Sequence, residues 1–174
     1  GLNSIQLIYL NLNELTDLPE GVFANLQTLE HLSLSRNFIR EIPANSFVGL
    51  NSLKDLSLYS NRINKLDSNL FRGLTSLNHL WLFENEIKEL PNDIFLGLRS
   101  LQILSLHSNQ INKLNEDVFQ GLVSILSINL SRNQISLLPD GVFQGLPLQN
   151  ILLIDNNLFE ISQYVFSPLG FSQN

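Results

Sequence analysis

Few side chains in this chain of 174 residues could do chemistry. The three histidines, His31, His79 and His107, could bind a metal ion or transfer a proton, and Glu84 and Glu86 could act as an acid–base pair. The chain contains no cysteine, which excludes a thiolate zinc site, a cysteine nucleophile and a disulfide framework. It also has no glycine-rich phosphate loop, no H-E-x-x-H motif and no G-x-S-x-G motif. Whether the histidines and glutamates can work together therefore depends on the elements that position them.

Composition narrows the classes of partner. Ten Lys and Arg stand against 16 Asp and Glu, a net charge of −6, whereas a surface that tracks nucleic acid needs clustered cations. We therefore expect no nucleic-acid partner. A hydrophobic share of 44% with a charged share of 15% excludes intrinsic disorder, and the sequence holds no apolar run long enough to cross a membrane. One N-glycosylation acceptor is present, Asn129-Leu130-Ser131.

An internal repeat organises almost the whole sequence. Each copy has two Leu or Ile residues two apart, an Asn three residues after the second of them, and a Phe ten residues after the Asn. The asparagines recur every 24 residues, and the last follows after 23: Asn13, Asn37, Asn61, Asn85, Asn109, Asn133 and Asn156. The frame L-x-x-L-x-L-x-x-N-x-L-x-x-L-P-x-x-x-F-x-x-L-x-x occurs seven times between about Ile5 and Phe171.

The repeat predicts a solenoid in a single domain over residues 1–174. The Leu-x-Leu alternation has the period of a short strand buried on one face, and successive strands run in the same direction, so we expect a curved parallel sheet. We expect each Asn to bond backbone groups of its own turn and of the next, and the Phe residues to stack as a spine. Loops and short helical turns should form the convex side. The predicted fold class is an α/β solenoid.

The frame resembles that of leucine-rich repeat proteins. Its 24-residue length and late Phe are similar to the "typical" subtype of animal extracellular proteins, such as Toll-like receptor ectodomains, and the segments LPEGVF (18–23) and LPDGVF (138–143) resemble those of variable lymphocyte receptors. The resemblance implies a horseshoe fold without enzymatic activity, a location outside the cell or at its surface, and ligand binding on the concave sheet.

The strands separate the residues that could do chemistry. His31 and His79 occupy the third position of two repeats that are not adjacent, so they should lie two strands and about 10 Å apart, too far to share a metal ion. Glu84 and Glu86 flank Asn85 at the edge of the sheet, where water reaches both carboxylates. We therefore expect no enzymatic activity, no metal and no cofactor.

Outward-facing positions of the predicted strands instead suggest a binding surface. The only tryptophan, Trp81, and Phe83 face outward on the central strand, and Tyr59 and His107 occupy the position of Phe83 in the neighbouring repeats. A contiguous aromatic cluster with a charged rim is typical of a protein-binding hot spot. The predicted ligand-binding residues are Arg36, Asp55, Tyr59, His79, Trp81, Phe83, Glu84, His107 and Arg132. Asn129 should also point outward, so a glycan there would exclude a partner from that end.

Both ends of the solenoid present apolar residues. Leu7 and Tyr9 face outward in the first repeat, and Leu152 and Ile154 do so in the last, although terminal repeats usually carry polar caps. The cysteine-bearing caps of the extracellular members of the family are absent. We therefore expect the chain to self-associate through its ends and, since it begins at Gly1 and contains no Met, to be a processed segment.

These observations favour a recognition module that binds a protein or glycan ligand through its concave sheet, most simply as the ectodomain of an immune-type receptor. Two other functions fit the same residues. One is a cell-adhesion or matrix module that binds a host protein, and the other is an intracellular scaffold, which the absence of cysteine permits.

Overall fold

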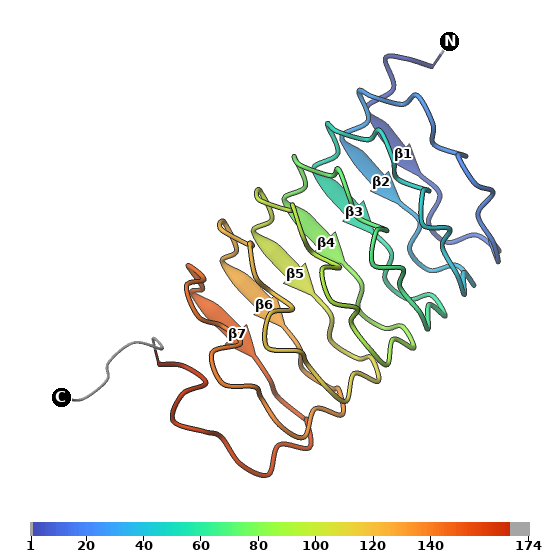
Figure 1. The fold of residues 1–174 in the computed structure, drawn as a ribbon. Coiled ribbons are helices and arrows are strands. Elements are labelled where there is room, and N and C mark those ends of the chain that lie inside the picture. The colour runs from blue at the N-terminus through green and yellow to red at the C-terminus, as the bar shows by residue number, and fades with distance from the viewer. Residues whose placement is uncertain (1, 168–174) are drawn as a thin grey trace.

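The computed structural model of the chain describes residues 2–167, and these residues form one parallel sheet of seven strands that pair in the order of the sequence (Figure 1). The strands are β1 (Leu7–Tyr9), β2 (His31–Ser33), β3 (Asp55–Ser57), β4 (His79–Trp81), β5 (Ile103–Ser105), β6 (Ser127–Asn129) and β7 (Asn150–Leu152). Each strand is followed by a loop that returns to the start of the next strand, which is the predicted solenoid. The last residues of the predicted seventh repeat, Phe171 among them, lie outside the described residues.

The alternation of Leu in the sequence sets which side of the sheet is buried. The middle residue of each strand points into the core and pairs with its equivalents in register, as Leu56 does with Leu32 and Leu80. The next Leu of the frame, such as Leu58 or Leu82, is completely buried as well. Because the residues between them point away from the core, the strands follow the period predicted for a sheet with one buried face.

Each asparagine of the frame ties two coils of the solenoid together. The Nδ2 of Asn61 donates to the carbonyl of Leu58 in its own coil and to that of Leu34 in the preceding coil, at 3.1 and 3.0 Å, and its Oδ1 accepts from the N–H of Ile39 at 3.0 Å. Asn37, Asn85, Asn109 and Asn133 repeat the pattern. The predicted bonds to the next coil are therefore wrong in direction, because the free carbonyl and N–H that face each Asn belong to the coil before it.

The phenylalanines of the frame stack in a continuous spine. Neighbouring rings from Phe23 to Phe166 lie 5.9 to 6.5 Å apart between centroids, with interplanar angles of 15° or less. Phe47, Phe71 and Phe95 are completely buried, whereas Phe166, at the end of the stack, is exposed. The predicted spine is confirmed.

The convex side consists of loops and short turns, as predicted, and residues 2–167 contain no helix. The return segments hold separate turns, in which an N–H donates to the carbonyl three residues earlier, as from Leu98 to Phe95 and from Leu101 to Leu98. Gly97 interrupts these turns with a positive φ of 88°, and Pro91 at the start of the segment has no N–H to donate. Consecutive helical hydrogen bonds therefore cannot accumulate, and the turns stay isolated. Over the same residues, no helix is long and apolar enough to span a membrane.

Candidate ligand-binding face

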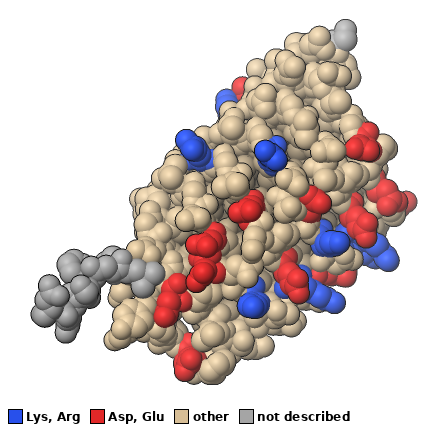
Figure 2. Space-filling view, in the orientation of Figure 1, with Lys and Arg blue, Asp and Glu red and all other residues tan. Residues whose placement is uncertain are grey.

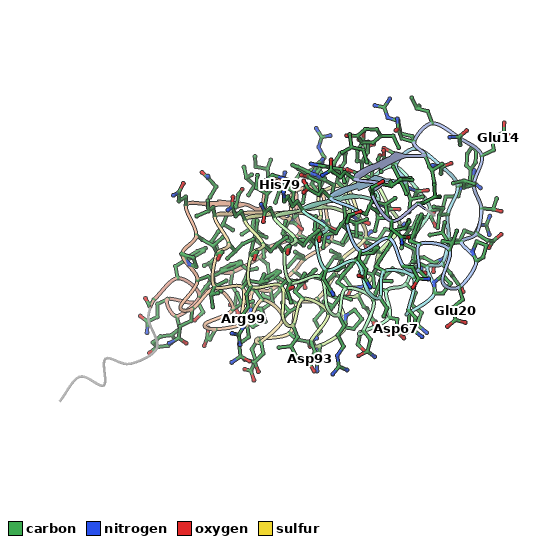
Figure 3. The ribbon with its side chains drawn as sticks, turned by 90° about the horizontal axis from the view of Figure 1, so that it is seen from above. Glu14, Glu20, Asp67, His79, Asp93 and Arg99 are labelled. Carbon is green, nitrogen blue, oxygen red and sulfur yellow. The ribbon has the colours of Figure 1, made fainter. Side chains whose placement is uncertain are left out.

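The outward side of the sheet, called here the strand face, consists of rows of equivalent residues from adjacent strands. In-register pairing places Asp55 between His31 and His79 in one row, and Ser57 between Ser33 and Trp81 in the next. Figure 3 shows His79 on the strand side of the molecule and Asp67, Asp93 and Arg99 on the opposite side. The candidate residues on the strand face therefore belong to one surface, the one predicted to be concave.

A ladder of three rings lies at the centre of the strand face. Tyr59, Phe83 and His107 come from three adjacent coils, and their ring centroids are 4.4 Å apart at each step, with interplanar angles of 5° and 10°. Trp81 meets Phe83 edge-on at 6.4 Å and lies tilted against His79 at 6.0 Å. The structure thus brings together the aromatic residues that the sequence singled out. We call Tyr59, Phe83 and His107 the ring ladder.

Asp55 connects three neighbours across strands β2 to β4. Its Oδ1 lies 3.0 Å from Nδ1 of His79 and accepts from the indole N–H of Trp81 at 3.4 Å, and its Oδ2 lies 3.4 Å from Nδ1 of His31. The two histidines therefore flank one carboxylate instead of standing as separate surface residues. Sequence reasoning left His31 out of the site, although its position in the same row as Asp55 and His79 was the available signal. Among the described residues no group of three or more His, Cys, Asp or Glu side chains is arranged to hold a metal ion.

The surroundings of His107 define its hydrogen-bonding state. Its Nδ1 lies 2.8 Å from the hydroxyl of Ser105 and 3.4 Å from Nδ2 of Asn129, whose Oδ1 accepts from the N–H of Ser131 at 3.0 Å. The backbone N–H of Ser131 can only donate, so the atom of Asn129 that faces it must be the oxygen Oδ1. The amide nitrogen of Asn129 therefore faces His107 and donates toward it. Nδ1 of His107 must then accept, which places the proton of the neutral ring on Nε2.

Burial and two charges act on the same imidazole. Burial lowers the pKa of His107 below its ordinary value of 6.5, the carboxylate of Glu84 opposes this by raising it, and the guanidinium of Arg132 lowers it further. The lowered pKa and the hydrogen bonds of Nδ1 both favour the neutral form of the His107 imidazole.

The charged residues predicted for the rim lie at the turn that ends each strand. Arg36, Glu84 and Arg132 are exposed, and their φ angles of 53° or 54° turn the chain out of the sheet. The carboxylate of Glu84 accepts a hydrogen bond from the hydroxyl of Ser60 in the preceding coil. Glu86 is exposed in the following loop, and no contact joins it to Glu84 within the described residues. The arrangement of these two glutamates does not resemble an acid–base pair.

Asn129 of the glycosylation acceptor lies on the strand face, at the end of β6. Its side chain is half-buried and takes part in the contacts with His107 and Ser131, and Ser131 is buried. The predicted glycan would therefore emerge beside the ring ladder. Its attachment remains a prediction.

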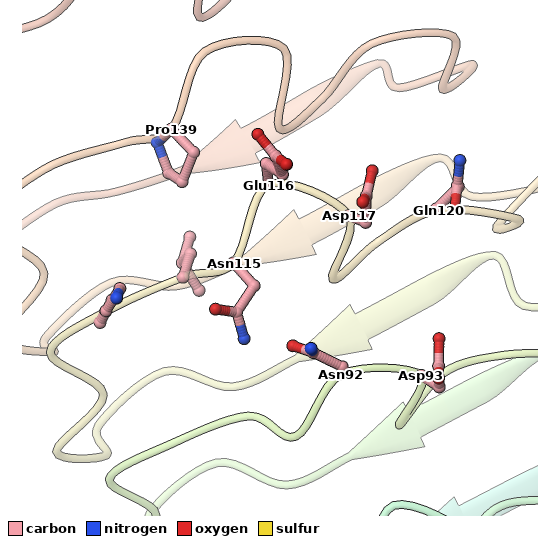
Figure 4. Close-up of a pocket in the computed structure, with 9 residues that line it drawn as sticks. Asn92, Asp93, Asn115, Glu116, Asp117, Gln120 and Pro139 are labelled. Atoms are coloured by element: carbon pink, nitrogen blue, oxygen red, sulfur yellow. The ribbon is translucent and has the colours of Figure 1, made fainter.

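Two hollows differ in position and chemistry. One, of about 260 Å³, lies on the strand face and is lined by Tyr9, His31, Leu32, Ser33, Asp55 and Ser57. A larger one, of about 470 Å³, lies on the return loops of the middle repeats (Figure 4) and is lined by Asn92, Asp93, Lys113, Leu114, Asn115, Glu116, Asp117, Gln120 and Pro139. The second is lined by carboxylates, amides and the ammonium group of Lys113, and no histidine lies among its lining residues.

Comparison with known proteins matches the repeat over most of the chain. A family model described as Leucine rich repeat matches residues 3–63, and one described as BspA type Leucine rich repeat region (6 copies) matches residues 40–170. A search of curated protein sequences found no significant match.

Two solved structures have the same fold over 94% of this chain. The first is TLR13, in a crystal structure of the TLR13–ssRNA13 complex, with a TM-score of 0.88 and 32% sequence identity. The second is the leucine-rich repeat protein LIC12759 of Leptospira interrogans, with a TM-score of 0.83 and 30% identity. The chain spans only 23% of the TLR13 chain and 40% of the LIC12759 chain. With its repeats, its sheet and its family matches in agreement, the chain belongs to the leucine-rich repeat family.

Proposed function

We propose that the chain is a recognition module without enzymatic activity, which binds a protein ligand through its strand face as part of an immune-type receptor outside the cell. The observation that carries the proposal is the cluster formed by the ring ladder and Trp81. Leucine-rich repeat domains are in general recognition modules, and the present site extends that role to particular residues.

The chemistry of the strand face supports binding better than simple cover of the sheet. The row of Trp81 also contains small residues, Ser33, Ser57 and Ser105, so the sheet does not require large side chains there. Aromatic rings offer a large contact area with little side-chain entropy to lose, and they dominate the energetics of protein interfaces. The ring ladder stands at the centre of the sheet, where a partner would bury it most completely.

The class of receptor is proposed from the repeats and from the similar structures. The 24-residue frame with LPEGVF and LPDGVF resembles the extracellular subtype found in variable lymphocyte receptors, and TLR13 has the same fold over most of the chain. TLR13 was solved with a single-stranded RNA, but a phosphate backbone requires clustered cations. Figure 2 shows more acidic than basic side chains on the face that it presents, and the net charge of the chain is −6, which favours a protein partner over a phosphate backbone.

A binding screen with matched variants tests the proposal. The chain is displayed against a panel of purified extracellular proteins, with a glycan array and single-stranded RNA as parallel arms. Trp81→Ala should weaken binding to the selected protein by about 2 kcal/mol or more, which is about 30-fold, because a central anchor carries a disproportionate share of the affinity. Tyr59→Ala and Phe83→Ala should follow.

Asp67→Ala provides the control, because Asp67 is exposed on the opposite side of the molecule. Each stacked pair in the ring ladder contributes about 0.5–1.5 kcal/mol, so a ladder variant can also lose stability. Thermal unfolding of every variant therefore distinguishes a loss of binding from a loss of folded protein. Unchanged affinity of the Trp81 variant, with loss at Asp67, would place the site elsewhere. Binding confined to the glycan or RNA arm would contradict a protein ligand.

A further inference from the structure

We propose that the strand face holds a receptor pocket for a basic side chain of the protein partner, best suited to arginine, with Asp55 as its counter-ion. The pocket is the hollow of about 260 Å³ on strands β1 to β3, beside Trp81 of β4, and we call it the serine trough. The inference rests on the proposed function, because it names the chemistry that the partner must present to this face.

The shape of the trough follows from one row of the sheet. In-register pairing orders this row as Tyr9, Ser33, Ser57 and Trp81, so two small side chains lie between two large aromatic ones. At about 4.8 Å per strand, Tyr9 and Trp81 stand roughly 14 Å apart along the row. The two serines thus form the floor of the trough, and the aromatic rings stand at its ends.

The charge of the trough comes from Asp55. Its side chain is 28% exposed, and no Lys or Arg among the described residues forms an ion pair with it. Its neighbours are the imidazoles of His31 and His79 and the indole N–H of Trp81, and Asp55 lines the same hollow as Ser33 and Ser57. A half-buried carboxylate whose only basic neighbours are imidazoles attracts a permanent cation, and a charge-assisted hydrogen bond to it is stronger than a neutral one.

The walls favour a guanidinium over an ammonium group. Tyr9 is 63% exposed, so its ring is free to contact a cation, and Trp81 presents an indole at the other end. Oδ1 of Asp55 already faces His79 and the indole N–H of Trp81, so an incoming cation has Oδ2 as its acceptor. The planar guanidinium can donate to Oδ2 while it stacks on an aromatic ring, whereas an ammonium group acts as a point charge. Additional N–H groups can donate to the hydroxyl of Ser57 on the floor.

The single tryptophan provides a direct reporter for this pocket. In the ¹⁵N-labelled chain, the indole N–H of Trp81, 3.4 Å from Oδ1 of Asp55, gives one resonance that can be followed during a titration. The probe is the tripeptide acetyl-Gly-Arg-Gly-amide, compared with peptides that carry citrulline or lysine in place of arginine. We expect a saturable shift with arginine, a weaker one with lysine and none with the neutral, isosteric citrulline.

Variants assign the effect to the trough. Asp55→Asn keeps the shape of the side chain but removes its charge, and should weaken arginine binding at least tenfold. Ser57→Leu should do the same by filling the floor, and it keeps the test valid if the first variant misfolds. Asp67→Asn, on the opposite side of the molecule, should bind like the parent. The backbone spectrum of each variant reports its folding.

The outcomes separate this inference from the proposed function. Equal shifts with arginine and citrulline, or full binding by both trough variants, would overturn the cationic pocket. If the selected protein partner depends on Trp81 but not on Asp55, the pocket fails while the recognition face stands. If arginine binds in the trough but the partner contacts the convex side, the proposed function fails and the pocket stands.

Discussion

Individual side chains on the strand face are held by their neighbours in defined states, and His107 is the clearest case. Its Nδ1 faces the amide N–H groups of Asn129, which a backbone N–H orients. Protonation of Nδ1 would place its N–H opposite the amide N–H of Asn129, so that two donors would face each other. It would also place a charge on a partly buried ring. The geometry of the hydrogen bonds and the lowered pKa therefore have related causes.

We predict that NMR titration of His107 gives a pKa below 6.5, because burial is the largest influence on it. Glu84→Gln should lower this pKa further, since the Glu84 carboxylate raises it, and Arg132→Gln should raise it. A value at or above 6.5 in the parent, or shifts of opposite sign in the two variants, would refute the assignment.

The same titration has a consequence for stability. A histidine whose folded pKa lies below its unfolded value binds protons more readily when the chain unfolds. The stability that depends on His107 is therefore complete above pH 6.5, and it is lost as the pH falls toward the lower pKa of the folded chain. His107→Gln should remove this part of the pH dependence in urea unfolding measured between pH 7 and 5.

In the core, the side-chain amide of Asn85 forms hydrogen bonds to backbone groups of its own coil and of the preceding coil. Asn85→Ala leaves the buried N–H of Ile63 without its acceptor and removes one of the two amide donors from each carbonyl of Leu58 and Leu82, which Asn61 and Asn109 still serve. It should cost about 1–3 kcal/mol in urea unfolding. Asn13→Ala is the matched control, because Asn13 is exposed and bonds only carbonyls of its own coil. Equal losses in the two variants would mean that the contacts between coils contribute little.

Among the elements, the strands contribute only three residues each, so the stacked loops must supply much of the cohesion. The phenylalanine spine does this with rings that are completely buried through the middle repeats. The convex side needs no helix to close the core, because the ring of one coil covers the ring of the next. Isolated turns are sufficient to return the chain.

Phe95→Ala should lower the free energy of unfolding by about 3–5 kcal/mol, through lost burial and the cavity between Phe71 and Phe119. Leu96→Ala is its control, because Leu96 follows directly in sequence and is 61% exposed. Denaturant unfolding measures both. Parent-like stability of the Phe95 variant would be incompatible with the spine.

The whole molecule is a stack in which each coil contacts the next, and its two ends differ from its middle. β1 and β7 form the edges of the sheet, and large apolar side chains near them are exposed: Leu7, Tyr9, Leu12, Leu152, Ile154, Phe159 and Ile161. An open strand edge beside apolar side chains favours pairing with another chain.

We predict that the 174-residue chain self-associates through these ends. Sedimentation at increasing protein concentration should show a rising average mass, and Ile154→Lys with Phe159→Lys should suppress it, because charges on an edge oppose pairing. Leu96→Lys, an equally drastic change away from the ends, should not. A monomer at every concentration would contradict the prediction.

The sequence by itself determined the architecture, because neighbours in a solenoid are residues one repeat apart. The 24-residue period of Leu, Asn and Phe therefore predicts which side chains are in contact. The strands, the phenylalanine spine and the contact of Asn61 with a neighbouring coil could all be predicted from it. The row that brings Tyr59, Phe83 and His107 together could be predicted for the same reason.

Only the tertiary structure decided how the side chains within those rows are oriented. The sequence placed His31 and His79 two strands apart, but the rotamers turn both toward Asp55, and the indole of Trp81 joins them. The direction of the asparagine bonds and the absence of helix in residues 2–167 were likewise set by which backbone groups were left unpaired and by the left-handed turns. Repeat spacing fixes which residues are neighbours, whereas torsion angles and competing hydrogen bonds fix what those neighbours do.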